Sequence, residues 1–292
     1  KKRFSLLYFT FFLLINFLIF SMLPSAGTII RESVQLYRKK FETFWFPILF
    51  IFIPNAAFAL IRFVTEIFLP TEPEARASIL LLAQIPAGLA TVWATVVLIQ
   101  LAGGLLTGTP KPLPELAKES LGKLLSVLWV YALAAAAVGG GFLLLLFPAL
   151  VFAGWFAFAG FRAIFENERG RAALRASRAL VAGRFAPVLW RLAAPATVFS
   201  LLVGLASSVA VGILGILAPA VRETLLTSAA VPPGPAAAID ILTSFVSALA
   251  APLFATAHIF LYRALTAGGP AKDTKHETRN TEHEAQNAER IP

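Results

Sequence analysis

The sequence predicts an all-α fold, a polytopic transmembrane helix bundle, and three observations support this class. The 292 residues are 58% hydrophobic and 14% charged, whereas an ordinary soluble domain carries roughly 25% charged residues. Several apolar runs reach the roughly 20 residues that a helix needs to cross the hydrocarbon core of a bilayer. None of these runs alternates like a strand of a membrane barrel, and a helix satisfies its own backbone hydrogen bonds where water is absent.

Seven apolar runs are candidate membrane spans. They are Phe4 to Leu23, Phe44 to Leu69, Ser78 to Leu106, Leu121 to Val138, Phe142 to Phe165, Pro187 to Leu217 and Ala237 to Leu265. Only three glycines, at 139–141, separate the fourth run from the fifth, which predicts a tight hairpin at that point. Prolines inside several runs should kink the helices.

These runs divide the chain into three parts. Residues 1–26 form an N-terminal apolar helix, and residues 27–267 form a membrane domain of six spans. Residues 268–292 are polar and of mixed charge, a composition that predicts a disordered tail.

The first apolar run allows three interpretations. A signal peptide would have a shorter apolar stretch, about 7–15 residues, and a better cleavage site than the stretch from Leu23 to Ala26. An extra spanning helix fits the length, but the basic residues 1–3 would then lie outside. The third is that the sequence lacks an upstream part, since it does not begin with methionine. We expect an uncleaved apolar helix.

Lysine and arginine fall on alternate connectors of the six-span domain. Nineteen lie on one side of the expected topology, and only Arg76 and Arg222 lie on the other. By the positive-inside rule the rich side is cytoplasmic, with both ends of the six spans inside a cell membrane. Because the cations sit beside apolar segments, the net charge of +9 predicts anionic lipid headgroups as partners and no nucleic acid.

Three segments on the basic side share a pattern. Each has a basic residue two positions before a serine, apolar residues on one helical face, and a tryptophan near the start of the next span. The basic and serine pairs are Arg31 and Ser33, Lys118 and Ser120, and Arg175 and Ser177, and the tryptophans are Trp45, Trp129 and Trp190. We interpret the domain as three repeats of an interfacial amphipathic helix plus a transmembrane hairpin. The alternative is three independent juxtamembrane helices.

The third segment is the most basic. Arg171, Arg175 and Arg178 are spaced by four and three residues, so they share one stripe of a helix that is otherwise rich in alanine, leucine and valine. Such a helix should lie on the cytoplasmic surface with its guanidinium groups reaching lipid phosphates. Headgroup contacts are predicted for Arg31, Arg38, Lys118, Arg171, Arg175, Arg178 and Arg184.

The same segment carries a family resemblance. The positions are Glu166, Gly170, Ala173, Leu174, Ser177, Leu180, Gly183, Arg184, Phe185 and Trp190, after a run that contains Pro148. They resemble the signature of the glycerophosphoryl diester phosphodiesterase membrane-domain family, over about Gly27 to Ala267. The resemblance implies a six-span bundle that in some proteins accompanies a phosphodiesterase catalytic domain. It supplies no catalytic residue.

Catalytic groups are scarce. The chain has three histidines, His258, His276 and His283, and no cysteine. A metal-dependent phosphodiesterase needs clustered histidines and carboxylates, and neither a phosphate-binding glycine loop nor a nucleophile elbow is present. We therefore expect no enzymatic activity, no metal site and no cofactor.

Four ionisable residues lie within or near spans: Arg62, Glu66, Asp240 and His258. Such residues suggest a function by default, here a polar pathway through a transporter or channel. The alternative, which we favour, places the first three near water at the outer interface and hydrogen-bonds His258 between helices.

The leading hypothesis is a non-enzymatic integral membrane protein that contacts lipid or assists membrane homeostasis. One alternative is a transporter or channel. The other is a membrane module that partners a lipid-processing phosphodiesterase.

Overall fold

The structure is a computed structural model, and it describes residues 23–227 and 232–267. These residues form ten α-helices and no strand. In chain order they are α2 (Ala26–Lys39), α3 (Phe41–Phe68), α4 (Pro73–Thr107), α5 (Leu113–Leu144), α6 (Leu146–Phe156), α7 (Ala159–Phe165), α8 (Arg171–Val181), α9 (Phe185–Leu217), α10 (Pro219–Thr227) and α11 (Pro233–Ala267).

Six helical segments of the described chain are long and apolar enough to cross a membrane. They are α3, α4, α5, the stretch Leu146–Phe165 that contains α6 and α7, α9 and α11. The predicted all-α membrane bundle is therefore confirmed, and each segment overlaps one of the last six apolar runs. The first run, apart from Leu23, and the tail at 268–292 lie outside the described residues, so these predictions stay untested.

The predicted hairpin at the glycine triplet is wrong in its position. Residues 139–141 are helical, and the chain turns at Leu145, which is fully extended between α5 and α6. Gly141 instead lets the two helices approach, because a Cβ there would lie 2.9 Å from the backbone nitrogen of Ala149 and 2.8 Å from the Phe152 ring. A helix that continues keeps its backbone hydrogen bonds, which matters most where water is absent.

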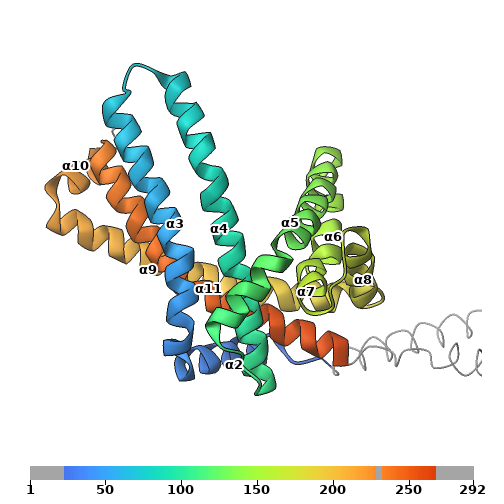
Figure 1. Cartoon of the computed structure of the whole chain (residues 1–292). Helices are drawn as coiled ribbons and strands as arrows, with labels where there is room; N and C mark the ends of the chain where they lie inside the picture. Colours follow the sequence, from blue (N-terminus) through green and yellow to red (C-terminus); the bar gives the residue numbers. More distant parts are fainter. Residues whose placement is uncertain (1–22, 228–231, 268–292) are drawn as a thin grey trace, which may run out of the picture.

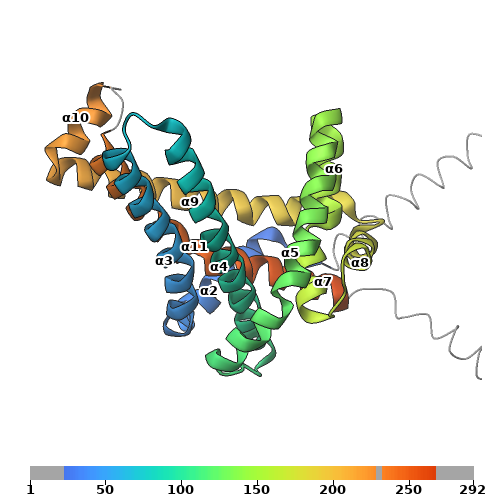
Figure 2. The same cartoon turned by 45° about the horizontal axis from the view of Figure 1, so that its top comes forward.

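The helices pack in two groups (Figures 1 and 2). α3 lies against α4 and α11, and α11 also contacts α9 and α2. α5 and α6 form an antiparallel hairpin that stands apart from α3 at its tip and rests on α4, α7 and α8 nearer its base. The two groups meet where the end of α4, the start of α5, α7 and the end of α11 come together.

Large apolar side chains cover the outside of the bundle. At the tip of the α5–α6 hairpin, six consecutive apolar residues from Phe142 to Phe147 are 63% to 88% exposed. Soluble proteins rarely expose a continuous apolar patch of this kind. In a membrane these side chains face lipid at no cost, which agrees with the spans assigned above.

Two of the three predicted amphipathic segments are separate helices. Ser25 caps the start of α2, because its hydroxyl accepts a hydrogen bond from the Thr28 backbone N–H over 3.1 Å, and the helix ends with Arg38 and Lys39 in its last turn. α8 is bounded by Gly170 and Gly183, which both have positive φ. The second segment is not a separate helix, because it forms the first turns of α5. The threefold repeat itself stays a prediction.

Candidate functional site

The arginine stripe of α8 faces outward. Arg171, Arg175 and Arg178 are exposed, while Ala173 and Ser177 on the opposite face are buried. The Ser177 hydroxyl donates to the Trp155 carbonyl oxygen over 2.7 Å and accepts from the Phe158 N–H over 3.1 Å. The hydroxyl thereby satisfies two backbone groups at the junction of α6 and α7, and it holds α8 against that junction.

The three arginines line an open hollow of about 480 Å³, which we call the α8 hollow. Its other lining residues are Phe156 and Leu174. The Arg178 guanidinium lies 4.2 Å from the centroid of the Trp155 ring, a cation–π contact that holds it at the rim. Among the described residues, no carboxylate forms an ion pair with any of these three arginines.

The other predicted headgroup residues occupy different positions. Arg31 and Arg38 are exposed on α2, and Lys118 is exposed near the start of α5. Arg184 is half-buried, and its guanidinium donates to the carbonyl oxygens of Leu180, over 3.2 Å, and Leu265, over 3.5 Å. Arg184 therefore joins the end of α8 to α11.

The serines of the predicted repeat are all fully buried, which the sequence did not indicate. Ser33 donates to its own helix, at the Ile29 carbonyl oxygen, over 2.7 Å. Ser120 donates across helices to the Gln100 side-chain oxygen over 3.2 Å. Each serine thus satisfies its hydroxyl inside the protein, and the three do so in different ways.

Three of the four ionisable residues predicted within or near spans form ion pairs with one another. Arg62 Nε lies 3.3 Å from Glu66 Oε1, and Arg62 Nη1 lies 2.9 Å from Asp240 Oδ2. These pairs join the last third of α3 to the first turns of α11 and leave the side chains 25% to 38% exposed. The pairing of Arg62 with Glu66 was foreseeable from their spacing, whereas the approach of Asp240 follows from the packing of α3 on α11.

His258 lies elsewhere on α11, and its predicted hydrogen bond between helices is wrong. Its Nδ1 lies 2.7 Å from the Phe254 carbonyl oxygen, one turn earlier in the same helix. The imidazole stacks on Phe161 of α7, with centroids 6.5 Å apart. Among the described residues no cluster of three or more histidine, aspartate or glutamate side chains is placed to hold a metal ion.

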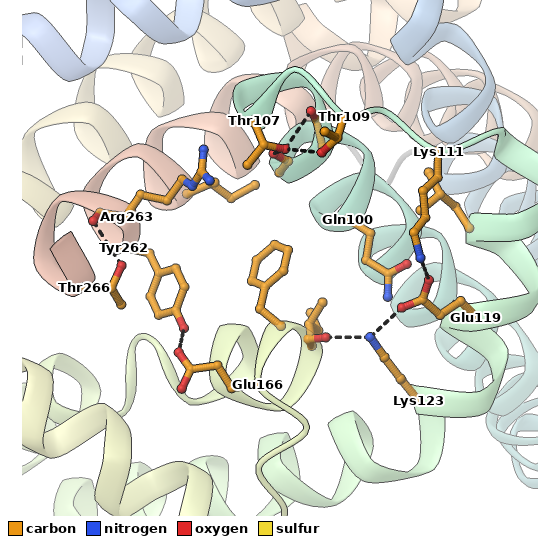
Figure 3. A pocket seen from close by; sticks show the side chains of 16 residues that line it. Gln100, Thr107, Thr109, Lys111, Glu119, Lys123, Glu166, Tyr262, Arg263 and Thr266 are labelled. Atoms are coloured by element: carbon orange, nitrogen blue, oxygen red, sulfur yellow. Dashed lines mark hydrogen bonds and ion pairs between the residues drawn. The ribbon is translucent and has the colours of Figure 1, made fainter. Parts of the chain in front are cut away.

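A second cavity, lined by more polar side chains, lies where α4, α5, α7 and α11 come together (Figure 3). We call it the end cavity, because it includes the connection between α4 and α5 and the last turns of α11. Its volume is about 390 Å³. Gln100, Glu119 and Lys123 lie on one side of it, and Tyr262 and Arg263 lie on the other.

Two lysines of the end cavity share one carboxylate. Lys111 Nζ and Lys123 Nζ each lie 2.8 Å from an oxygen of Glu119, and Lys123 also donates to the Ile164 carbonyl oxygen over 2.7 Å. The hydrogen bond to Glu119 raises the pKa of the Lys111 ammonium group above its ordinary value. Lys111 is therefore a permanent cation at neutral pH.

On the opposite wall, Glu166 accepts hydrogen bonds from Arg162 and from the Tyr262 hydroxyl. Tyr262 in turn stacks on Phe161 and Phe165, so an aromatic layer lies beside the polar groups. These cavity residues come from four segments that are distant in the chain, so the cavity itself was not predictable from the sequence.

The fold and the composition of the described helices define the class of this protein, a polytopic α-helical integral membrane protein. No protein-family model, no curated protein and no solved structure matches the chain.

Proposed function

We propose that the protein is a non-enzymatic integral membrane protein whose α8 hollow binds the headgroups of anionic phospholipids. The observation that carries the proposal is the arrangement of Arg171, Arg175 and Arg178 around one hollow, free of described carboxylate partners. These cations lie at the edge of an apolar bundle and have no carboxylate partner among the described residues. In a membrane, lipid phosphates are then their nearest counterions.

The chemistry of the hollow suits a phospholipid. A guanidinium group offers a planar set of N–H donors that matches two phosphate oxygens at once. Phe156 and Leu174 provide apolar surface beside these donors, where the glycerol and the first methylenes of a lipid would lie. Basic residues near an anionic membrane surface each contribute about 1 kcal/mol of attraction.

The distribution of lysine and arginine supports a cytoplasmic orientation for α8 and a cell-membrane location. Three groups of exposed side chains on the basic side support this proposal. They are the arginines of α2, the arginines of α8, and the tryptophans at 45, 129 and 190. Membership of the glycerophosphoryl diester phosphodiesterase membrane-domain family, and partnership with a lipid-processing enzyme, stay proposals that fit a lipid-contacting module.

The test is native mass spectrometry of protein released from nanodiscs that contain phosphatidylglycerol and phosphatidylcholine. The wild type should retain phosphatidylglycerol in preference to phosphatidylcholine. A variant that combines Arg171→Gln, Arg175→Gln and Arg178→Gln should lose most of this preference and keep its helical content.

The matched control combines Arg76→Gln with Arg222→Gln. Arg76 lies in the first turn of α4 and Arg222 lies on α10. Both belong to the side of the predicted topology opposite α8, so the control should retain phosphatidylglycerol as the wild type does. Equal retention by the α8 variant and the wild type would end the proposal.

A further inference from the structure

We propose that the end cavity is a second, separate binding site, and that it takes a phosphoryl group held by Gln100, Lys123 and Arg263. The site goes beyond the lipid contact proposed for α8, because it lies among other helices and shares no lining residue with the α8 hollow.

The strongest indication is the side-chain amide of Gln100. The residue is only 7% exposed, and its oxygen already accepts the hydrogen bond from Ser120. Its nitrogen, Nε2, is buried and has no hydrogen-bond partner among the described residues. Buried polar groups of native proteins are nearly always hydrogen-bonded, so an unpaired amide that lines a cavity indicates a ligand that accepts from it.

The charges of the cavity favour an anion. Its two carboxylates are already occupied: Glu119 by Lys111 and Lys123, and Glu166 by Arg162 and Tyr262. Arg263 lines the same cavity and forms no ion pair with any carboxylate in the described chain. A cation without a counterion among the described residues is thus left facing the space where Gln100 Nε2 lacks an acceptor.

The donors come from three helices and surround one space (Figure 3). Gln100 is on α4, Lys123 is on α5 and Arg263 is on α11. Lys123 uses two of its three N–H groups on Glu119 and Ile164, so one donor is left for a ligand. A phosphoryl group presents several acceptor oxygens in different directions, and it satisfies donors that converge from different sides better than a single carbonyl oxygen does.

The size and the apolar wall of the cavity allow more than the phosphoryl group itself. A volume of about 390 Å³ falls within the range of small-molecule sites. Leu116, Phe165 and Ile259 provide apolar surface beside the donors. The phosphoryl group therefore belongs either to a phospholipid headgroup or to a soluble phosphate compound, and the experiment separates these two sources.

Binding is measured by isothermal titration of the purified protein in uncharged detergent with three probes. These are inorganic phosphate, a short-chain phosphatidic acid, and succinate as an anion without phosphorus. We expect phosphatidic acid to bind and succinate not to bind. If inorganic phosphate binds as well, the natural ligand is a soluble phosphate compound. If phosphatidic acid binds and inorganic phosphate does not, the natural ligand is a phospholipid headgroup. Succinate binding equal to that of both phosphates, or no binding of either phosphate, overturns the proposal.

Two variants connect the binding to the cavity. Arg263→Gln and Gln100→Met, each made in the triple α8 variant so that the α8 hollow does not bind the probe, should weaken phosphatidic acid binding by about tenfold or more, since each removes hydrogen bonds to a charged acceptor. Their matched controls are Arg222→Gln and Gln84→Met, which make the same changes at exposed positions outside the cavity. The proposal fails if both cavity variants bind as tightly as these controls.

The two proposed sites are tested independently by the same set of proteins. Arg263→Gln should leave the phosphatidylglycerol retention of the α8 hollow unchanged. The triple α8 variant should in turn keep phosphatidic acid binding at the end cavity, although it loses the binding of this anionic lipid at the α8 hollow. If the α8 variant alone abolishes binding of the probe, the ligand sits at α8 and the end cavity is not its site.

Discussion

The guanidinium of Arg191, on α9, donates to the Pro24 carbonyl oxygen over 2.8 Å, although the two residues are 167 positions apart in the chain. A second N–H of the same group reaches the Leu23 carbonyl oxygen over 3.4 Å. Arg191 is only 3% exposed. A charged group this well buried is tolerated because the carbonyl oxygens that precede α2 accept its hydrogen bonds.

Replacing Arg191 with methionine should lower the free energy of unfolding by about 2 kcal/mol, because it leaves buried carbonyl oxygens without a donor. The measurement is reversible unfolding in mixed detergent micelles. Arg222→Met, at an exposed position of α10, is the control and should change stability little. A variant as stable as this control would contradict the structural role of Arg191.

The contact between Arg62 and Asp240 predicts an energetic coupling between α3 and α11. Arg62→Gln and Asp240→Asn should each destabilise the protein slightly, and the double variant should lose less than the sum of the two. The coupling should be about 0.5–1 kcal/mol, because both side chains are partly exposed and such pairs are screened. Strictly additive losses would show that the 2.9 Å contact contributes no stability.

The three glycines at 139–141 should respond differently to the same substitution. Gly139→Ala and Gly140→Ala meet open space, and they should stabilise α5 by roughly 0.5–1 kcal/mol, the ordinary gain of alanine over glycine in a helix. Gly141→Ala should destabilise the protein by about 1–3 kcal/mol, because its methyl group would press on the backbone of Ala149.

Thermal unfolding of the three single variants in one detergent checks this order. The two flanking glycines serve as internal controls, since all three changes occur in the same helix. If Gly141→Ala were as stable as Gly140→Ala, the close approach of α5 and α6 would be wrong.

The charge distribution predicts the orientation in the membrane. A cysteine introduced at Glu72, between α3 and α4, should react with an impermeant maleimide added to intact cells. A cysteine at Arg169, between α7 and α8, should react only after the membrane is made permeable. The cysteine-free sequence makes single labelling sites straightforward to interpret. The opposite result at both positions would reverse the cytoplasmic assignment of α8.

Local sequence predicts the spans well, because the property that defines a membrane helix is the length of its apolar run. Each of the last six runs overlaps one of the six long apolar helical segments, and the amphipathic patterns around Arg31 and Arg171 each fall within a separate helix. The position of the α5–α6 turn was not predictable in this way. Three glycines indicate a turn in a soluble chain, but here the helix continues through them, and Gly141 alone of the three serves a contact with the neighbouring α6.

The polar contacts depended on packing. Arg191 counted as one of many connector cations in the sequence, although it is buried against the start of α2. Gln100 was one of two glutamines in its apolar run, and nothing in the sequence set it apart from the exposed Gln84. Their roles follow from neighbours that are distant in the chain.

By itself the sequence determined the class of the protein, the six described spans and the arginine stripe of α8, because each follows from composition or spacing within one helix. Only the tertiary structure decided which buried polar groups are satisfied and which are not. The reason is physical: burial and hydrogen bonding at Gln100, Arg191 and Arg263 are set by the helices that pack around them.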